Sequence, residues 1–181
     1  MELVLKAGYF ALPAFFAGIV PVLLAKLKWF EFLNKPVDFN GKIGNEFIFG
    51  NHKTWRGLIF APIAGIAVAY IQLLLYANPS LRSISILNYN DYWLLFGALA
   101  GLGAIIGDLV KSFFKRRFKI GAGKPWPVFD QIDSAVGFLA FTYAIAWPDL
   151  AVIFIILILA LVVSPVTNIA AYFLGIKKVW W

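Results

Sequence analysis

Cysteine is absent from this 181-residue chain, which therefore has no disulfide framework and no thiolate metal site. Histidine occurs once, at His52, so the chain does not provide for a histidine-based metal centre. Acidic residues are also scarce: 9 Asp and Glu stand against 16 Lys and Arg, and the formal net charge is +7. Positive charge of this size can bind anionic lipid headgroups or nucleotides.

Charged residues of both signs make up only 14% of the chain, whereas hydrophobic residues make up 62% and the mean hydropathy is +0.83. A soluble domain of this length would have too little polar surface with that composition. A membrane-spanning helix needs ~20 apolar residues. We therefore predict an all-α polytopic membrane protein with about five transmembrane helices. The apolar stretches are 8–25, 57–77, 91–110, 134–147 and 150–174.

The connections between these stretches predict the topology. Six of the 16 Lys and Arg residues lie in the loop 26–56, six lie in the loop 111–133, and two lie in the tail at 177–178. The other side has only Lys6 and Arg82. Because basic loops are retained in the cytoplasm, we predict an outside N-terminus, a cytoplasmic C-terminus and two basic cytoplasmic loops. Neither loop has a core of its own, so the whole chain (1–181) is a single membrane domain.

The third stretch ends in a group of charged residues. Four of its residues are glycines that would let another helix approach closely: Gly97, Gly101, Gly103 and Gly107. Asp108 follows, and a carboxylate at the mouth of a membrane helix is a candidate functional residue. Lys111, Ser112 and Lys115 recur at spacings of three and four, so they share a helix face with Asp108. A local ion pair between Asp108 and Lys111, worth ~0.2–0.5 kcal/mol where exposed, is the purely structural alternative.

Two further carboxylates follow a loop that contains glycine and proline. Asp130 and Asp133 stand three residues apart, so they share a face of the next helix. Helix capping alone is one interpretation, because carboxylates favour the positive end of the helix dipole. The other interpretation is that they meet Asp108 across a helix interface and hold Mg²⁺, which prefers oxygen ligands and bridges to substrate phosphates.

Two weaker signals lie elsewhere. The segment NHKTWRG (51–57) offers donors to a triphosphate or a lipid phosphate, although basic residues before an inward-facing helix end are expected in any case. These donors are Asn51, Lys53, Thr54 and Arg56. Asn168, within the last apolar stretch, either faces the same cavity or makes an interhelical hydrogen bond.

The motifs together resemble a known family. GDLVKSFFKRRFKIG (107–121) and PVFDQIDS (127–134), with NHKTWRG upstream and TNIAAYFLGIKK downstream, are similar to the CTP transferase family of phosphatidate cytidylyltransferases. The resemblance covers most of 51–178, and it is greatest to the archaeal branch, the CDP-archaeol synthases. The chain lacks the Lys-Asp and the His-Gly-Gly of the bacterial and eukaryotic pattern, and these departures favour the archaeal branch.

The resemblance implies Mg²⁺-dependent transfer of CMP from CTP to 2,3-bis-O-geranylgeranylglycerol 1-phosphate, an unsaturated archaetidic acid, with release of pyrophosphate. It implies Asp108, Asp130 and Asp133 as metal ligands and Lys111 and Ser112 as further catalytic residues. The implied nucleotide- and phosphate-binding residues are Asn51, Lys53, Thr54, Arg56, Lys115, Arg116 and Asn168.

We expect a multi-pass protein of the cell membrane, with its active site at the cytoplasmic face and membrane lipids around it. The resemblance also implies a homodimer, and we expect no nucleic-acid partner. A CDP-alcohol phosphotransferase would need a repeated aspartate signature, whereas Asp133 is followed by Ser-Ala-Val. A non-enzymatic carrier of anionic lipid or phosphate remains the alternative function.

Overall fold

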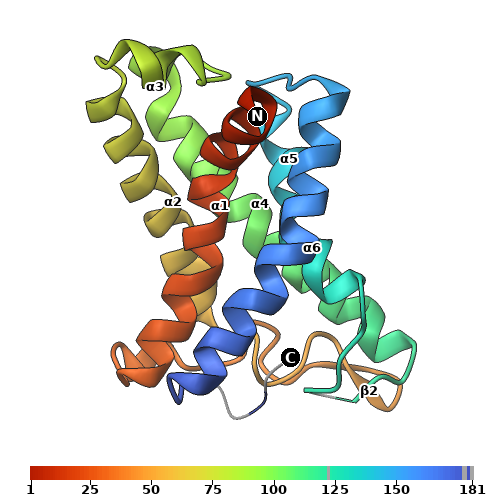
Figure 1. The fold of residues 1–181 in the computed structure, drawn as a ribbon. Helices are drawn as coiled ribbons and strands as arrows, with labels where there is room; N and C mark the ends of the chain where they lie inside the picture. Colours follow the sequence, from red (N-terminus) through yellow and green to blue (C-terminus); the bar gives the residue numbers. More distant parts are fainter. Residues whose placement is uncertain (122, 177–178, 180–181) are drawn as a thin grey trace.

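A bundle of α-helices with a small β-hairpin at one end forms the computed structural model of the chain, which describes residues 1–121, 123–176 and 179 (Figure 1). The helices are α1 (Glu2–Lys26), α2 (Trp55–Leu75), α3 (Pro79–Ser83), α4 (Tyr89–Arg117), α5 (Phe129–Thr142) and α6 (Leu150–Phe173). A 3₁₀ turn covers Glu31–Leu33, and the hairpin strands are β1 (Lys42–Ile43) and β2 (Glu46–Phe47). Lys177 and Lys178, which were counted for the orientation, lie outside the described residues.

The predicted all-α polytopic architecture is confirmed. Among the described residues, α1, α2, α4 and α6 are the helices long and apolar enough to cross a membrane. The predicted stretch 134–147 instead corresponds to α5, which has 14 residues and ends at Thr142. At ~1.5 Å per residue it is about 21 Å long, shorter than a hydrocarbon core of about 30 Å. Helix α1 begins at one end of the bundle and α6 ends at the opposite end (Figure 1).

The loop predicted over 111–133 is shorter in the structure, where it covers only 118–128. Helix α4 continues to Arg117, and α5 already begins at Phe129. Three cations in the last turn of α4 favour this extension, because positive charge stabilises the C-terminal end of a helix dipole. At 29 residues, about 43 Å, α4 is also longer than a hydrocarbon core. The helix is therefore long enough to span the apolar layer and still carry its basic last turn outside it.

Helix α4 packs against α2 on one side and against α5 on the other, and its glycines make both contacts close. A Cβ at Gly97 or Gly101 would overlap the backbone of α2, where Gly65 faces them. A Cβ at Gly103 or Gly107 would overlap the backbone of α5. The predicted role of these glycines in close helix packing is thus confirmed. Because α4 has no side chains at these positions on two of its faces, both α2 and α5 can approach it closely.

Aromatic side chains fill the centre of the bundle. The ring of Phe10 on α1 lies 5.1 Å from that of Phe96 on α4 and 5.1 Å from that of Phe138 on α5, measured between centroids. All three are almost completely buried. Helix α6 is different, because its buried residues, Val152, Ile156 and Ala160, lie in its first half only. The second half of α6 therefore has little packing against the bundle.

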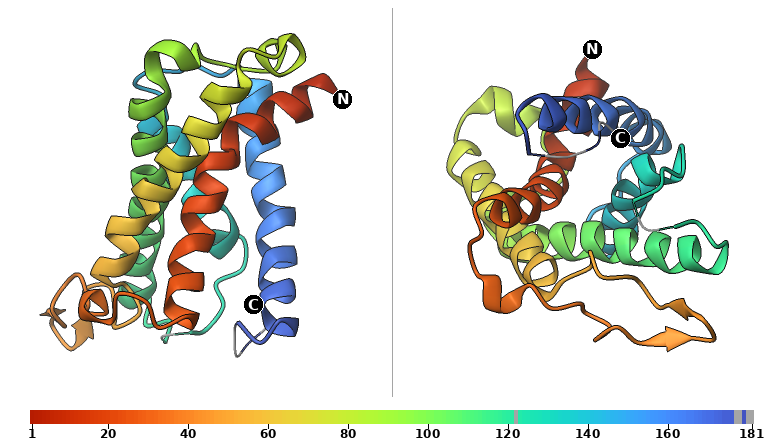
Figure 2. Two further views of the ribbon diagram at one scale, coloured as in Figure 1. Left: turned by 90° about the vertical axis from the view of Figure 1, so that its left-hand side faces the viewer. Right: turned by 90° about the horizontal axis from the view of Figure 1, so that it is seen from below.

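The hairpin and the end of α4 lie side by side, as the view from below shows (right panel of Figure 2). The guanidinium of Arg117 donates to the carbonyl oxygens of Ile43 at 3.0 Å and Phe47 at 2.9 Å. Asp38 fixes the return of this loop, because its Oδ2 accepts from the backbone N–H of Phe49 at 2.8 Å. The chain is thereby directed back to residues 51–54 and the start of α2.

Candidate active site

A cavity of about 1230 Å³ opens at the end of the bundle where the hairpin lies. Its polar lining comes from residues 50–54, the last turns of α4 and the first turns of α5. Its apolar wall comes from α1 and from the second half of α6, residues such as Ile19 and Val163. The left panel of Figure 2 shows a gap between the ribbons of these two helices at this end, and the Lys26 ammonium group spans it by donating to the Leu174 carbonyl at 3.0 Å. All of the site residues predicted from the sequence line this one cavity.

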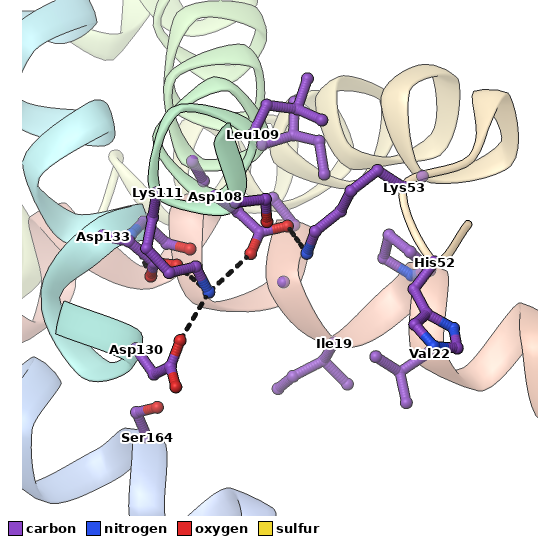
Figure 3. A pocket seen from close by; sticks show the side chains of 18 of the residues that line it. Ile19, Val22, His52, Lys53, Asp108, Leu109, Lys111, Asp130, Asp133 and Ser164 are labelled. Carbon is purple, nitrogen blue, oxygen red and sulfur yellow. Dashed lines mark hydrogen bonds and ion pairs between the residues drawn. The ribbon is translucent and has the colours of Figure 1, made fainter. Parts of the chain in front are cut away.

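A group of three carboxylates and three ammonium groups lies in this cavity, and we refer to it as the carboxylate–lysine cluster; Figure 3 labels its members except Lys115. Lys111 Nζ lies 3.1 Å from Asp108 Oδ1, 3.0 Å from Asp130 Oδ1 and 2.8 Å from Asp133 Oδ2. Lys53 Nζ lies 2.5 Å from Asp108 Oδ2, and Lys115 Nζ lies 3.0 Å from Asp130 Oδ2. The members are Asp108, Asp130, Asp133, Lys53, Lys111 and Lys115.

The close approach of α4 and α5 brings the aspartates together. Gly107 contacts the backbone at Asp133 so closely that a Cβ there would overlap the Asp133 carbonyl. Asp108 is the next residue along α4, and Lys111 and Lys115 follow on the same face. Ser112 lies in the same stretch, is 4% exposed and also lines the cavity. The glycine contact thus sets the geometry of the charged group next to it.

Lys53 reaches the cluster from a segment that the backbone holds in place. The Lys53 carbonyl accepts from the N–H of Val37 at 2.8 Å, and the Trp55 N–H donates to the Lys35 carbonyl at 3.0 Å. Pro36 and Thr54 form an isolated β-bridge between these two bonds. Two segments of the loop therefore support Lys53, which reaches Asp108 from outside α4 and α5.

Asp130 and Asp133 at the start of α5 have pKa values shifted in opposite directions. Burial raises the pKa of Asp130, but the Trp126 N–H and the Lys111 and Lys115 ammonium groups more than offset it, so its pKa lies below the ordinary value. Burial dominates at Asp133 and raises its pKa, despite the opposing effect of Lys111. The N-cap residue of α5 is Val128, so neither aspartate occupies the capping position. Their main partners are the lysines.

The predicted metal ligands converge on an ammonium group. Across the part of the chain that the structure describes, no three carboxylate, imidazole or thiolate groups surround a common metal position. Asp108, Asp130 and Asp133 instead surround Lys111 Nζ. Carboxylate oxygens are the donors that Mg²⁺ prefers, and these three already enclose one cation. The donor types therefore suit a divalent metal, although in this arrangement they surround the Lys111 ammonium group.

The remaining predicted residues differ in what they contact. Arg56 is 5% exposed, and its guanidinium donates to the Trp29 carbonyl at 3.1 Å and to Asn34 Oδ1 at 3.4 Å. It therefore ties the segment after α1 to the start of α2, although it also lines the cavity. Arg116 contributes a buried Nε that has no hydrogen-bond partner among the described residues.

A comparison with protein-family models matches residues 1–181 to the CarS-like CDP-archaeol synthases. The chain belongs to this family. A CDP-archaeol synthase of Methanocaldococcus jannaschii is 39% identical over 153 residues, which cover 81% of this chain and 83% of the relative. The CDP-archaeol synthase of Pyrococcus furiosus is 32% identical over 183 residues and is covered, like this chain, to 100%.

A solved structure is also similar to this member of the CDP-archaeol synthase family. It is described as an intramembrane enzyme for archaeal membrane lipids biosynthesis, and it superimposes with a TM-score of 0.75 at 27% identity. The match covers 92% of this chain and 94% of the solved one. The resemblance identified from the sequence motifs is thus confirmed at the level of family and fold.

Several cavity residues of this CDP-archaeol synthase family member were not identified from the sequence. Ser164 and Thr167 precede Asn168 on α6, and all three line the cavity. Their spacing of three and four marks one polar helix face, so a periodicity test within the last apolar stretch could have found them. Gln131 lines the cavity too, and its buried Oε1 has no partner among the described residues. Gln131 follows Asp130 directly, and the spacing of three that linked Asp130 to Asp133 did not indicate it.

Proposed function

We propose that the protein is a CTP-dependent lipid cytidylyltransferase that catalyses the CDP-archaeol synthase reaction. It transfers CMP from CTP to 2,3-bis-O-geranylgeranylglycerol 1-phosphate and releases pyrophosphate. The observation that carries the proposal is that one cavity joins the carboxylate–lysine cluster to an apolar wall of α1 and α6. Such a cavity suits a substrate with a phosphate head and hydrocarbon tails. Membership of the CDP-archaeol synthase family supports the same reaction.

The reaction needs no catalytic base in this site. A phosphate monoester has a second pKa near 6, so the lipid phosphate is largely a dianion at neutral pH. One of its oxygens attacks the α-phosphorus of CTP, and the bond from that phosphorus to the bridging oxygen of the β-phosphate breaks. The electron pair leaves with pyrophosphate, and no proton has to move. The protein's task is positioning and charge neutralisation.

Cationic and hydroxyl donors around the cavity are assigned to the phosphates. Lys53 and Thr54 approach from the segment before α2, and Lys115 and Arg116 approach from α4. The unpartnered Nε of Arg116 supports its assignment, because a buried donor without a partner destabilises the protein until a ligand accepts from it. The remaining proposed contacts are Asn51, Lys111, Ser112 and Asn168. Arg56 has an indirect role: its bonds to Trp29 and Asn34 hold the segment after α1 against the start of α2.

Asp108, Asp130 and Asp133 are the proposed ligands of Mg²⁺. When bound, this ion offsets charge on the nucleotide phosphates and on the leaving pyrophosphate. These residues come from two helices that the glycine contact holds at a fixed separation.

The lipid tails are assigned to the opening between α1 and the second half of α6. Ile19 and Val22 on α1 and Val163 on α6 line the cavity there. Two isoprenoid chains would lose hydrophobic stabilisation by leaving the bilayer, so a lateral opening lets the phosphate enter while the tails stay in the hydrocarbon. We further propose that the site faces the cytoplasm of a cell-membrane protein. The homodimer implied by the family resemblance remains a prediction, and light scattering in detergent would test it.

The deciding experiment measures pyrophosphate release by the purified protein with Mg²⁺, CTP and digeranylgeranylglyceryl phosphate. Release that requires all three components supports the cytidylyltransferase. Substitution of ATP for CTP, omission of lipid and addition of EDTA are the controls, and each is expected to abolish release. A folded protein that releases no pyrophosphate, but moves anionic lipid between leaflets of vesicles without CTP, would establish the carrier function instead.

A further inference from the structure

Lys111 is the only residue whose side chain contacts all three aspartates of the cluster in the part of the chain that the structure describes. Its side chain is 13% exposed, and that of Asp133 is 7% exposed. Three carboxylates this close would repel one another strongly in a poorly solvated site without a cation between them. Lys111 therefore stabilises the arrangement of the aspartates in the protein without substrate.

The six carboxylate oxygens of the cluster all have partners. Asp108 uses Oδ1 for Lys111 and Oδ2 for Lys53. Asp130 uses Oδ1 for Lys111 and Lys115, and its Oδ2 accepts from the Trp126 N–H at 2.6 Å. Asp133 uses Oδ2 for Lys111, and its Oδ1 accepts from the Ser134 N–H at 2.5 Å. Any metal ion that binds here must first replace existing bonds.

The charges of the cluster are also balanced, since three ammonium groups face three carboxylates. A divalent ion alone would add two positive charges to a neutral, partly buried group, and the displaced ammonium group would need an acceptor other than the three carboxylates. Nucleotide phosphates supply both needs, because they bring negative charge and oxygen acceptors for Lys111. Metal and nucleotide should therefore increase each other's affinity, as linkage requires.

We propose that Lys111 is a resident counter-ion of the three aspartates and a positioning residue for the metal. It releases one oxygen of each aspartate only when nucleotide phosphates accept its ammonium group, so the divalent metal binds together with the nucleotide and not alone. This inference rests on the proposed function, because it takes CTP as the nucleotide. It adds an order of binding and the residue that imposes it.

The test uses Mn²⁺ as the probe and the full-length protein in detergent without lipid, so that no turnover occurs. Loss of the sharp electron paramagnetic resonance signal of free Mn²⁺ measures binding of the metal alone. Equilibrium dialysis of radiolabelled CTP, with Mn²⁺ and with EDTA, measures coupling. For the wild type we expect weak binding of Mn²⁺ alone and CTP affinity at least ~5-fold higher with the metal.

The decisive variant is Lys111→Met, which keeps an unbranched side chain of similar length and removes its charge. It should bind Mn²⁺ alone at least ~5-fold more tightly than the wild type, and its coupling between metal and CTP should fall. Its melting temperature in EDTA should be lower than that of the wild type and should rise more on addition of Mn²⁺. Lys119→Met is the matched control, because Lys119 is exposed and does not line the cavity, and it should behave as the wild type.

The possible failures can be told apart. Tight binding of Mn²⁺ to the wild type without nucleotide would overturn the inference, even if Lys111→Met could not be purified. Equal affinity of Lys111→Met and the wild type for Mn²⁺ alone would also overturn it. Absence of CTP binding to the wild type under every condition would instead contradict the proposed function. CTP binding that is coupled to the metal, without pyrophosphate release when lipid is added, would separate the order of binding from the proposed reaction.

Discussion

Each aspartate of the cluster has a distinct set of partners at the residue scale. Asp108 connects the two lysines that come from different parts of the chain, Lys53 and Lys111. Asp130 binds two lysines of α4 and a backbone N–H, and Asp133 is the most buried of the three. Loss of one carboxylate therefore removes a specific partner and leaves a cation in excess. Loss of Asp108 would leave Lys53 without the carboxylate that it contacts in the cluster, and would remove one of the three carboxylates around Lys111.

We expect Asp108→Asn to lower the rate of pyrophosphate release by at least ~100-fold, because an amide cannot balance the two lysines or bind a metal with comparable strength. The variant should remain monodisperse in gel filtration, since its size is unchanged. Asp149→Asn is the control, because Asp149 is exposed beyond the other end of the bundle and should retain full activity. Activity of Asp108→Asn within threefold of the wild type would exclude Asp108 as a metal ligand.

Two elements decide the shape of the site. Helix α4 presents glycines to α5, and this contact sets the distance between Asp108 and Asp133. Helix α6 does the opposite, because its second half packs loosely and leaves the cavity open beside α1. Close packing at one helix and its absence at the other thus give a rigid charged region beside an accessible apolar one.

The first contact can be tested with Gly107→Ala. The new methyl group would overlap the Asp133 carbonyl, so α4 and α5 must separate. Such overpacking typically costs ~1–3 kcal/mol, and here it would also displace the aspartates. We expect both a lower melting temperature and a large loss of activity. Gly8→Ala is the matched control, since nothing lies within 4 Å of a Cβ at Gly8, and it should leave both quantities unchanged or slightly improved.

The second element can be tested with Ala171→Phe on α6. Ala171 lines the cavity on its apolar side, so a larger side chain should obstruct the lipid tails and leave the nucleotide region intact. We expect the KM for the lipid to rise several-fold while the KM for CTP stays the same. Ala151→Phe, at the exposed start of the same helix, should change neither value. An equal rise in both KM values would argue against a separate lipid region.

The whole molecule is electrically asymmetric along the bundle. The basic end carries the cluster, the hairpin and the cationic last turn of α4, whereas Lys6 and Arg82 belong to the opposite end. Helices α1, α2, α4 and α6 are long enough to place these two ends on different sides of a membrane. The positive-inside rule then predicts that the cavity opens to the cytoplasm, where retained basic residues accumulate.

The absence of cysteine makes this topology directly testable. Arg82→Cys and Lys119→Cys each introduce a single exposed thiol at opposite ends of the bundle. A membrane-impermeant maleimide added to intact cells should label Arg82→Cys, and it should label Lys119→Cys only after permeabilisation. The cysteine-free wild type is the background control. The reverse labelling pattern would mean that the active site faces outward.

Sequence alone determined the features that depend on local composition and period. Long apolar stretches specify membrane helices, and four glycines on α4 specify close neighbours whatever the rest of the fold. The motifs around Asp108 and Asp130 also identified the family, because they lie in short continuous segments. These signals need no knowledge of distances between remote residues.

Only the tertiary structure decided how remote segments meet. Lys53 and Asp108 are 55 positions apart, and no periodicity relates them. The convergence of three aspartates on Lys111, the bonds of Arg56 to the segment after α1, and the short length of α5 likewise depend on packing between elements. Sequence patterns constrain which face a residue occupies, whereas the partner across that face follows from helix separations that are properties of the whole bundle.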